Sequence, residues 1–169
     1  DLVSRMAAVL GRSDEAERYR TLFAGIRQAF VKRWVADDGR VGDDTQGSYA
    51  LALHFSLLDE PLRTKAVERL TDAIARNGGH PTTGFWSSIE MLLALSANGQ
   101  HAVASRMVAL REKPSWGQMA ESGTTFWEAF NATEENLSLN HWTHSAVGEW
   151  LWRNVAGINP DEQHPGYER

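Results

Sequence analysis

The spacing of apolar residues is helical in nearly every periodic segment of this chain, and this feature constrains the fold most strongly. Tyr19, Leu22, Phe23, Ile26 and Phe30 recur at intervals of three and four residues, which places them on one face of a helix. No stretch alternates convincingly between apolar and polar residues at a period of two, as a half-buried strand would. The sequence therefore predicts an all-α protein.

Two kinds of predicted helix follow one another along the chain. The first kind is apolar on most sides, which is typical of helices buried by several neighbours, and comprises residues 46–58, 84–97 and 141–156. The second kind is amphipathic, which is typical of helices with one face in solvent, and comprises residues 14–36, 60–76 and 100–111. Their alternation predicts stacked αα-hairpins, arranged either as a solenoid or as a closed ring of paired helices.

The linkers between these helices are also of two kinds. Those that precede an apolar helix are polar and bear aromatic residues: GRVGDDTQGS, GGHPTTGFWSS and the long stretch from Pro114 to Trp142. Those on the other side, LLDEP and SANGQH, are short and plain. In a ring of hairpins all linkers of the first kind emerge on one face, and loops on a rigid scaffold often carry function. We therefore expect the functional site on that face.

Composition argues against several classes of function. The net charge is -5 and Lys and Arg form no block, which argues against binding to nucleic acid or to an anionic membrane surface. The chain has no cysteine, which excludes disulfides and thiolate metal sites, and no apolar run approaches the roughly 18 residues of a membrane-spanning helix. His141 and His144 are three residues apart without a third ligand at helical spacing, so we expect no metal site and no cofactor.

Residues 122–142, SGTTFWEAFNATEENLSLNHW, hold the candidate chemistry. Glu128 could activate a water molecule while the neighbouring Trp127 excludes solvent and packs on a sugar. Alternatively, Glu128 opens a helical turn and interacts favourably with the N-terminal dipole. His141 either contacts a ligand or is a locally bonded residue at a helix start, with Asn140 as the cap.

Further candidates lie in the other linkers of the same face. Trp86 and Trp116 either line a pocket or anchor their loops. Asp44 could bind hydroxyl groups, cap the following helix, or both, and capping is the favoured interpretation. Glu149 is expected to pair with Arg153, four residues further along a helix. Core spacing on the last helix predicts a packing role for three more tryptophans, namely Trp142, Trp150 and Trp152.

Four short motifs together carry a resemblance to a known family. They are TTGF, PSWG, T-x-WE and SLNH, and they occur in the family's order and spacing. From about residue 40 to its end, the chain resembles the second half of the catalytic barrel of glycoside hydrolase family 78, the inverting α-L-rhamnosidases. The resemblance implies an (α/α)6 barrel of twelve helices, of which this chain would supply about seven, or roughly half.

The resemblance also implies roles for particular residues. Glu128, in T-x-WE, would be the general base, and His141, in SLNH, would contact sugar hydroxyl groups. The other expected substrate-binding residues are Trp127, Trp116, Trp86, Phe85 and Asp44. Inversion requires two carboxyl groups, one acid and one base. The family's general acid belongs to an acidic motif upstream, and nothing in residues 1–40 resembles it. We therefore expect the isolated chain to hydrolyse little or nothing.

The domain organisation and partners follow as expectations. Residues 1–158 would form the partial barrel, and residues 159–169, with HPGYER, would lead toward a C-terminal β-sandwich. The expected substrate is a rhamnose-containing glycoside or oligosaccharide. A half barrel would expose apolar stripes, so the isolated chain should self-associate or require the missing half. The alternative function is a non-catalytic helical module that binds carbohydrate or another protein. Periplasmic, extracellular and cytoplasmic locations all remain open.

Overall fold

The structure is a computed structural model that describes residues 1–132 and 137–161, and these residues are predominantly helical. Within these two ranges there is no strand, only an isolated bridge between Val35 and Val41. The all-α prediction is thus confirmed. The elements in chain order are α1 (Leu2–Val9), α2 (Ser13–Trp34), α3 (Gln46–His54), α4 (Leu62–Arg76), α5 (Phe85–Ala97), α6 (His101–Ala109), α7 (Trp116–Ser122), α8 (Trp142–Ser145), α9 (Val147–Trp150) and the π-helical turn η1 (Leu151–Val155).

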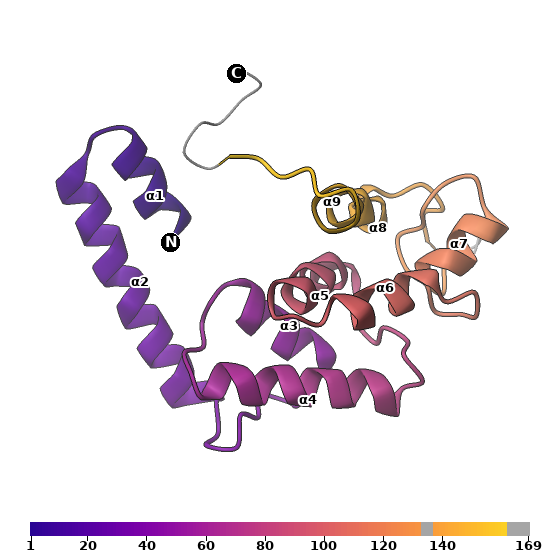
Figure 1. Ribbon diagram of the computed structural model, residues 1–169, viewed down its shortest axis with the longest axis horizontal. Coiled ribbons are helices and arrows are strands. Elements are labelled where there is room, and N and C mark those ends of the chain that lie inside the picture. The colour runs from indigo at the N-terminus through magenta and orange to yellow at the C-terminus, as the bar shows by residue number, and fades with distance from the viewer. Residues whose placement is uncertain (133–136, 162–169) are drawn as a thin grey trace.

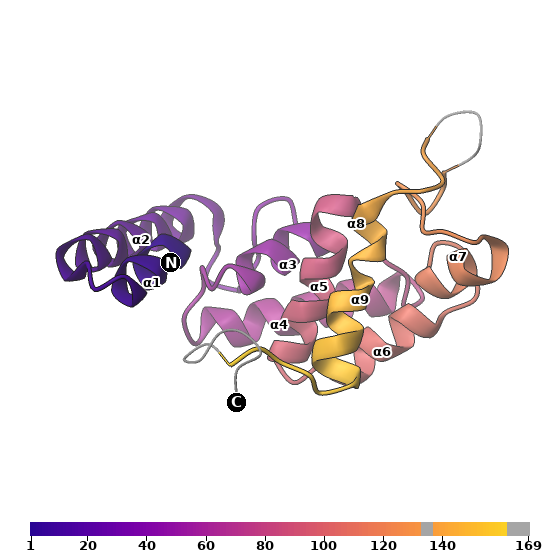
Figure 2. The ribbon, with the colours of Figure 1, turned by 90° about the horizontal axis from the view of Figure 1, so that it is seen from above.

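The helices are arranged as a row of hairpins (Figures 1 and 2). Helices α3, α5 and the α8–α9–η1 segment lie side by side, and α4 and α6 pack on α3 and α5 respectively. The α1–α2 hairpin stands at one end of this row. The predicted alternation of inner and outer helices therefore holds for the described residues.

Burial follows the two kinds of helix that the sequence distinguishes. In α4 a single face is buried, with Val67, Leu70 and Ile74 at helical spacing, whereas α5 is buried over most of its circumference. The shared core is assembled from the inner helices and the facing stripes of the outer ones. Its fully buried large side chains include Tyr49, Leu70, Met91, Leu92, Leu95, Met107, Trp116, Met119 and Trp150.

The last predicted helix, residues 141–156, is divided into α8, α9 and η1 rather than continuous. Of its three tryptophans, Trp150 is buried, whereas Trp142 and Trp152 are 69% and 61% exposed. The packing prediction was therefore right for Trp150 and wrong for the other two. Since Trp152 follows Trp150 by only two residues, it points to nearly the opposite side of the helix. The predicted Glu149–Arg153 ion pair is confirmed at 3.0 Å.

Two further predictions meet the structure in different ways. Residues 113–140 were expected to be mostly loop with one short turn, and the described part contains the seven-residue helix α7 with loop on either side. The predicted linker 159–169 lies mostly outside the described residues.

No helix in the part of the chain that the structure describes is long and apolar enough to cross a membrane.

Candidate functional site

Hydrogen bonds join the linkers that precede the inner helices, as the predicted single face requires. Gln46, at the start of α3, donates to the carbonyl of His80 over 3.2 Å and accepts from the amide of Thr82 over 2.8 Å. The ring of His80 bonds to the carbonyl of Pro114 over 3.1 Å. The linkers before α3, α5 and α7 therefore meet at one edge of the row of hairpins.

Three residues of the PSWG motif have a structural role in the linker that follows α6. Ser115 caps α7, because its hydroxyl oxygen accepts from the amide of Gln118 over 3.0 Å. At Gly117 an added Cβ would lie 2.3 Å from the carbonyl oxygen of Leu110, so the close approach of the two backbones requires glycine. Trp116 between them is 2% exposed, and its indole N–H donates to the carbonyl of His144 over 3.1 Å.

The T-x-WE and SLNH motifs pair with each other. The amide of Glu128 donates to the carbonyl of Ser138 over 2.8 Å, and the amide of His141 donates to the carbonyl of Phe126 over 2.8 Å. The Thr125 hydroxyl donates to the carbonyl of Leu139. Although nine residues lie between the two motifs, these bonds hold the two principal candidates, Glu128 and His141, on adjacent segments.

The Glu128 side chain is half-buried and oriented by its neighbour. The amide of Ser138 donates to Oε2 of Glu128 over 3.1 Å, so Glu128 and Ser138 bond twice. Among the described residues this amide is the one hydrogen-bond donor to the carboxylate that the structure shows. A carboxylate held at one oxygen can present the other to a water molecule, which is the arrangement that a general base requires. Glu128 lies outside any helix, although it directly precedes a single turn in which the amide of Ala132 donates to the carbonyl of Ala129 over 3.0 Å.

His141 has the local role at a helix start that the sequence left open. It is itself the N-cap of α8, since its Nδ1 accepts from the amide of Thr143 over 3.3 Å and lies 2.6 Å from the Thr143 hydroxyl. Asn140 is therefore not the cap. Because Nδ1 accepts from an amide, it is unprotonated and the proton resides on Nε2. The ring is thus fixed with one N–H donor, suited to a hydroxyl oxygen.

The predicted aromatic residues fall into an exposed and a buried group. Trp86 is 70% exposed, and Phe85 beside it lies 6.0 Å from the His141 ring, centroid to centroid. Trp127 is 8% exposed, with the Lys113 ammonium 5.8 Å from its ring centroid. Trp116 is more deeply buried still. The structure therefore brings Phe85 to His141, whereas the rings of Trp116 and Trp127 mainly pack within the protein.

A cavity of about 320 Å³ lies beside these segments. This volume is at the lower end of the range for small-molecule sites. The cavity is bounded by the TTGF linker, by the residues that follow Glu128 and by α8, through residues that include Thr83, Phe85, Ala129, Asn131 and His144. Glu128 itself is not among its lining residues.

His144 is a component that the sequence did not identify as part of the site. It is 1% exposed, and its Nδ1 lies 2.8 Å from the carbonyl oxygen of Trp127. Burial, partly offset by this backbone hydrogen bond, lowers the pKa of His144 below 6.5. The ring is therefore neutral at pH 7. Its position three residues after His141, on a helix predicted to be apolar on most sides, is the only signal in the sequence.

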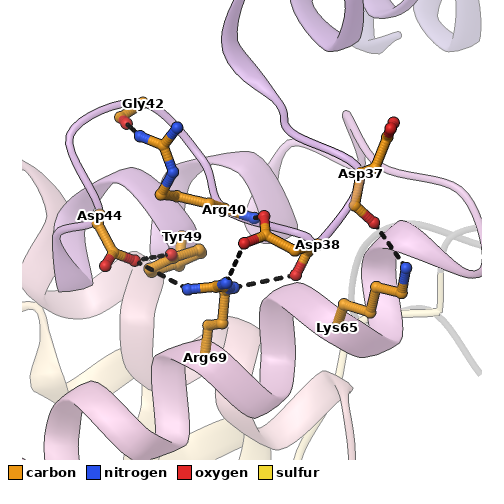
Figure 3. Close-up of polar contacts among 8 residues, drawn as sticks. All are labelled: Asp37, Asp38, Arg40, Gly42, Asp44, Tyr49, Lys65 and Arg69. Carbon is orange, nitrogen blue, oxygen red and sulfur yellow. Dashed lines mark hydrogen bonds and ion pairs between the residues drawn. The ribbon is translucent and has the colours of Figure 1, made fainter.

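Asp44 is occupied by other protein groups (Figure 3). Its carboxylate accepts a hydrogen bond from the Tyr49 hydroxyl and lies 3.7 Å from Arg69, which also pairs with Asp38. The cap of α3 is Thr45, whose hydroxyl oxygen accepts from the amide of Ser48, so the capping interpretation of Asp44 is wrong. Asp44 and Arg69 tie the linker before α3 to α4, and this leaves the carboxylate less able to bind a ligand.

The Asp44–Tyr49 contact contributes to the stability of the fold, and this contribution can be tested at alkaline pH. Burial, and then the hydrogen bond to Asp44, raise the pKa of Tyr49 from 10.0 to about 12. Between these values the unfolded chain releases the proton and the folded chain retains it, so the stabilisation is complete below pH 10 and is lost as the pH rises toward 12. Two pH units correspond to about 2–3 kcal/mol. The free energy of unfolding, measured with urea, should therefore fall more between pH 9 and pH 11.5 in the wild type than in Tyr49→Phe. An equal decrease in the two proteins would contradict this account.

No metal site emerges from the described ranges. In residues 1–132 and 137–161 no group of three or more His, Asp or Glu side chains is placed to hold a metal ion.

Comparison with known proteins identifies relatives of the chain. Residues 1–155 match the family described as the bacterial alpha-L-rhamnosidase 6 hairpin glycosidase domain. An alpha-L-rhamnosidase of Streptomyces avermitilis is 40% identical over 169 residues, which cover 95% of this chain and 16% of that protein. Another, of Formosa agariphila, is 32% identical over 171 residues, covering 94% of this chain and 18% of that protein. The chain thus spans about a sixth of the length of these relatives.

Solved structures agree with this assignment. The crystal structure of the Streptomyces avermitilis alpha-L-rhamnosidase complexed with L-rhamnose superposes with a TM-score of 0.89 at 39% identity, covering 97% of this chain and 16% of that chain. The crystal structure of native alpha-L-rhamnosidase from Aspergillus terreus superposes with a TM-score of 0.88 at 29% identity, covering 96% of this chain and 20% of that chain. The predicted resemblance is confirmed, as is the helical barrel fold: the chain belongs to the family of bacterial α-L-rhamnosidase six-hairpin glycosidase domains.

Proposed function

We propose that this chain supplies the general base and part of the sugar pocket for the inverting hydrolysis of terminal α-L-rhamnosyl linkages, with Glu128 as the base. The observation that carries the proposal is the pair of hydrogen bonds between Glu128 and Ser138, which orients the carboxylate. The S. avermitilis relative was crystallised with L-rhamnose, which supports a rhamnose-containing substrate.

The second carboxyl group is assigned to residues upstream of this chain. An inverting glycosidase places its two carboxyl groups about 6.5–9.5 Å apart, so that a water molecule fits between the base and the sugar. In this arrangement Glu128 removes a proton from the water as it attacks the anomeric carbon, while the upstream acid protonates the leaving oxygen. The domain assignment of residues 1–158 as a partial barrel, followed by a linker, belongs to the same proposal.

Sugar contacts are proposed for the residues that the structure leaves accessible. His141 would donate its Nε2–H to a hydroxyl oxygen, since its Nδ1 is used in capping α8. Phe85 and Trp86 would offer apolar rings beside it. Trp116, Trp127 and Asp44 would act through packing and loop structure, because the two rings are buried and the carboxylate is paired.

The test uses a protein that combines this chain with its upstream residues. It should hydrolyse an aryl α-L-rhamnoside, and proton NMR of the first product formed should show the β-anomer of rhamnose. Initial release of the α-anomer would rule out inversion. Saturable rhamnose binding without any turnover would instead support the non-catalytic carbohydrate-binding alternative.

We also propose that the isolated chain self-associates through apolar side chains exposed at the two ends of the helical row. These side chains are 41–78% exposed and comprise Leu2, Val3, Met6, Val9 and Leu10 of the first hairpin, and Leu151, Trp152, Val155 and Ile158 near the last described residues. A contiguous patch of exposed apolar side chains usually marks an interface.

Light scattering should therefore give an average mass that exceeds the monomer and rises with protein concentration. Replacing both Val9 and Leu10 by Lys should lower that mass. A constant monomer mass at high concentration would contradict the proposal.

A further inference from the structure

We propose that His144 is a positioning residue, which fixes the peptide group between Trp127 and Glu128 and thereby the direction in which Glu128 presents its carboxylate. This inference rests on the proposed role of Glu128 as the general base. His144 does not itself face the reacting atoms in this scheme.

The geometric argument starts from one peptide plane. The carbonyl oxygen of Trp127 and the amide N–H of Glu128 belong to the same planar group. A carbonyl oxygen only accepts, so the 2.8 Å contact means that Nδ1 of His144 carries the proton and donates it. At the other side of the plane the Glu128 N–H donates to Ser138 over 2.8 Å. Both ends of the plane are thus held, which fixes the Cα atom of Glu128, because this atom lies in the same plane. From this fixed point the bond from the Ser138 amide to Oε2 orients the carboxylate.

His144 is itself held firmly enough to act as a support. Its ring centroid lies 4.3 Å from that of Phe130 and 6.0 Å from that of Trp116, which meets it edge-on. The Trp116 indole N–H donates to the backbone carbonyl of His144 over 3.1 Å. Helix α7 therefore braces His144, and His144 in turn braces the Trp127–Glu128 peptide.

Packing alone does not account for a histidine at this place. Its Nε2 is buried and has no hydrogen-bond partner among the described residues. A buried polar atom without a partner destabilises the fold, and an apolar side chain would avoid that penalty. The hydrogen bond made by the opposite nitrogen supplies a reason for the imidazole, since no hydrocarbon can hold the Trp127 carbonyl.

A matched pair of substitutions isolates this hydrogen bond. Asn and Leu share the same branched arrangement of side-chain heavy atoms, but the Asn amide nitrogen can take the place of Nδ1 as a donor. In the protein that combines this chain with its upstream residues, His144→Leu should lower kcat at least tenfold and change KM less than threefold. His144→Asn should keep kcat within threefold of the wild type. His54→Leu, at an exposed histidine on α3, serves as the control with unchanged kinetics.

The outcomes separate this inference from the proposed function. Equal kcat in the Leu and Asn variants, with the wild type active, would overturn the positioning role. An inactive wild type, or full activity in Glu128→Gln, would instead overturn the proposed function. In that case hydrogen exchange measured by mass spectrometry still decides about His144. Faster exchange at the amides of Glu128 and His141 in the Leu variant, but not in the Asn variant, supports the inference, and equal exchange in the two variants overturns it.

Discussion

Replacing Glu128 by Gln is expected to lower kcat for an aryl α-L-rhamnoside by about 10²–10⁴-fold, the range that general acid–base catalysis usually contributes. The amide is nearly isosteric with the carboxylate, and its oxygen can still accept from the Ser138 amide. It cannot take a proton from water. The substitution therefore removes the chemistry while keeping the hydrogen bond that orients the side chain. The measurement is steady-state kinetics in the protein that combines this chain with its upstream residues.

Glu121→Gln is the matched control for this experiment. Glu121 is seven residues earlier, exposed, and paired with Arg111 over 2.6 Å on the surface. An exposed pair of this kind contributes little to stability, so kcat should stay within twofold of the wild type. If Glu128→Gln retained the turnover of this control, Glu128 could not be the base.

The sequence was sufficient to predict the architecture because helical periodicity and linker type are local signals. The stripe of Val67, Leu70 and Ile74 identifies α4 as a helix with one buried face, and the structure agrees. The long linkers lie before the inner helices, and Gln46, His80 and Thr82 now connect two of them. A local signal is enough here because hairpin stacking places every second linker on the same edge.

Partners of individual side chains were less predictable, because they come from elements far apart in the sequence. Asp44 was expected to cap α3, yet its carboxylate pairs with Arg69 from α4, 25 residues later by the sequence numbering, and Thr45 caps instead. Likewise, nothing in the residues around Glu128 indicates that Ser138 and His144 form hydrogen bonds with the peptide group between Trp127 and Glu128. Such contacts depend on how the linkers fold over one another, which the spacing of apolar residues does not encode.

Trp116→Ala is expected to have the largest effect on stability, with a loss of about 3–5 kcal/mol in the free energy of unfolding, as is usual for truncating a buried aromatic side chain. Trp116 is 2% exposed, its ring packs edge-on against Phe130 at 5.0 Å, and its N–H bonds to the carbonyl of His144. Alanine would leave both a cavity and an unpaired carbonyl group. For a chain of this size the melting temperature should fall by about 6–20 °C.

Trp152→Ala tests whether this loss is a matter of burial rather than of removing any indole. Trp152 is 61% exposed, so its truncation should change the free energy of unfolding by less than about 0.5 kcal/mol. Both variants should be compared by thermal unfolding of the isolated chain at low concentration, where association contributes least. Equal losses would mean that Trp116 does not anchor the linker. A loss confined to Trp116→Ala would show that the support beneath His144, and hence beneath the Trp127–Glu128 peptide, is part of the folded core.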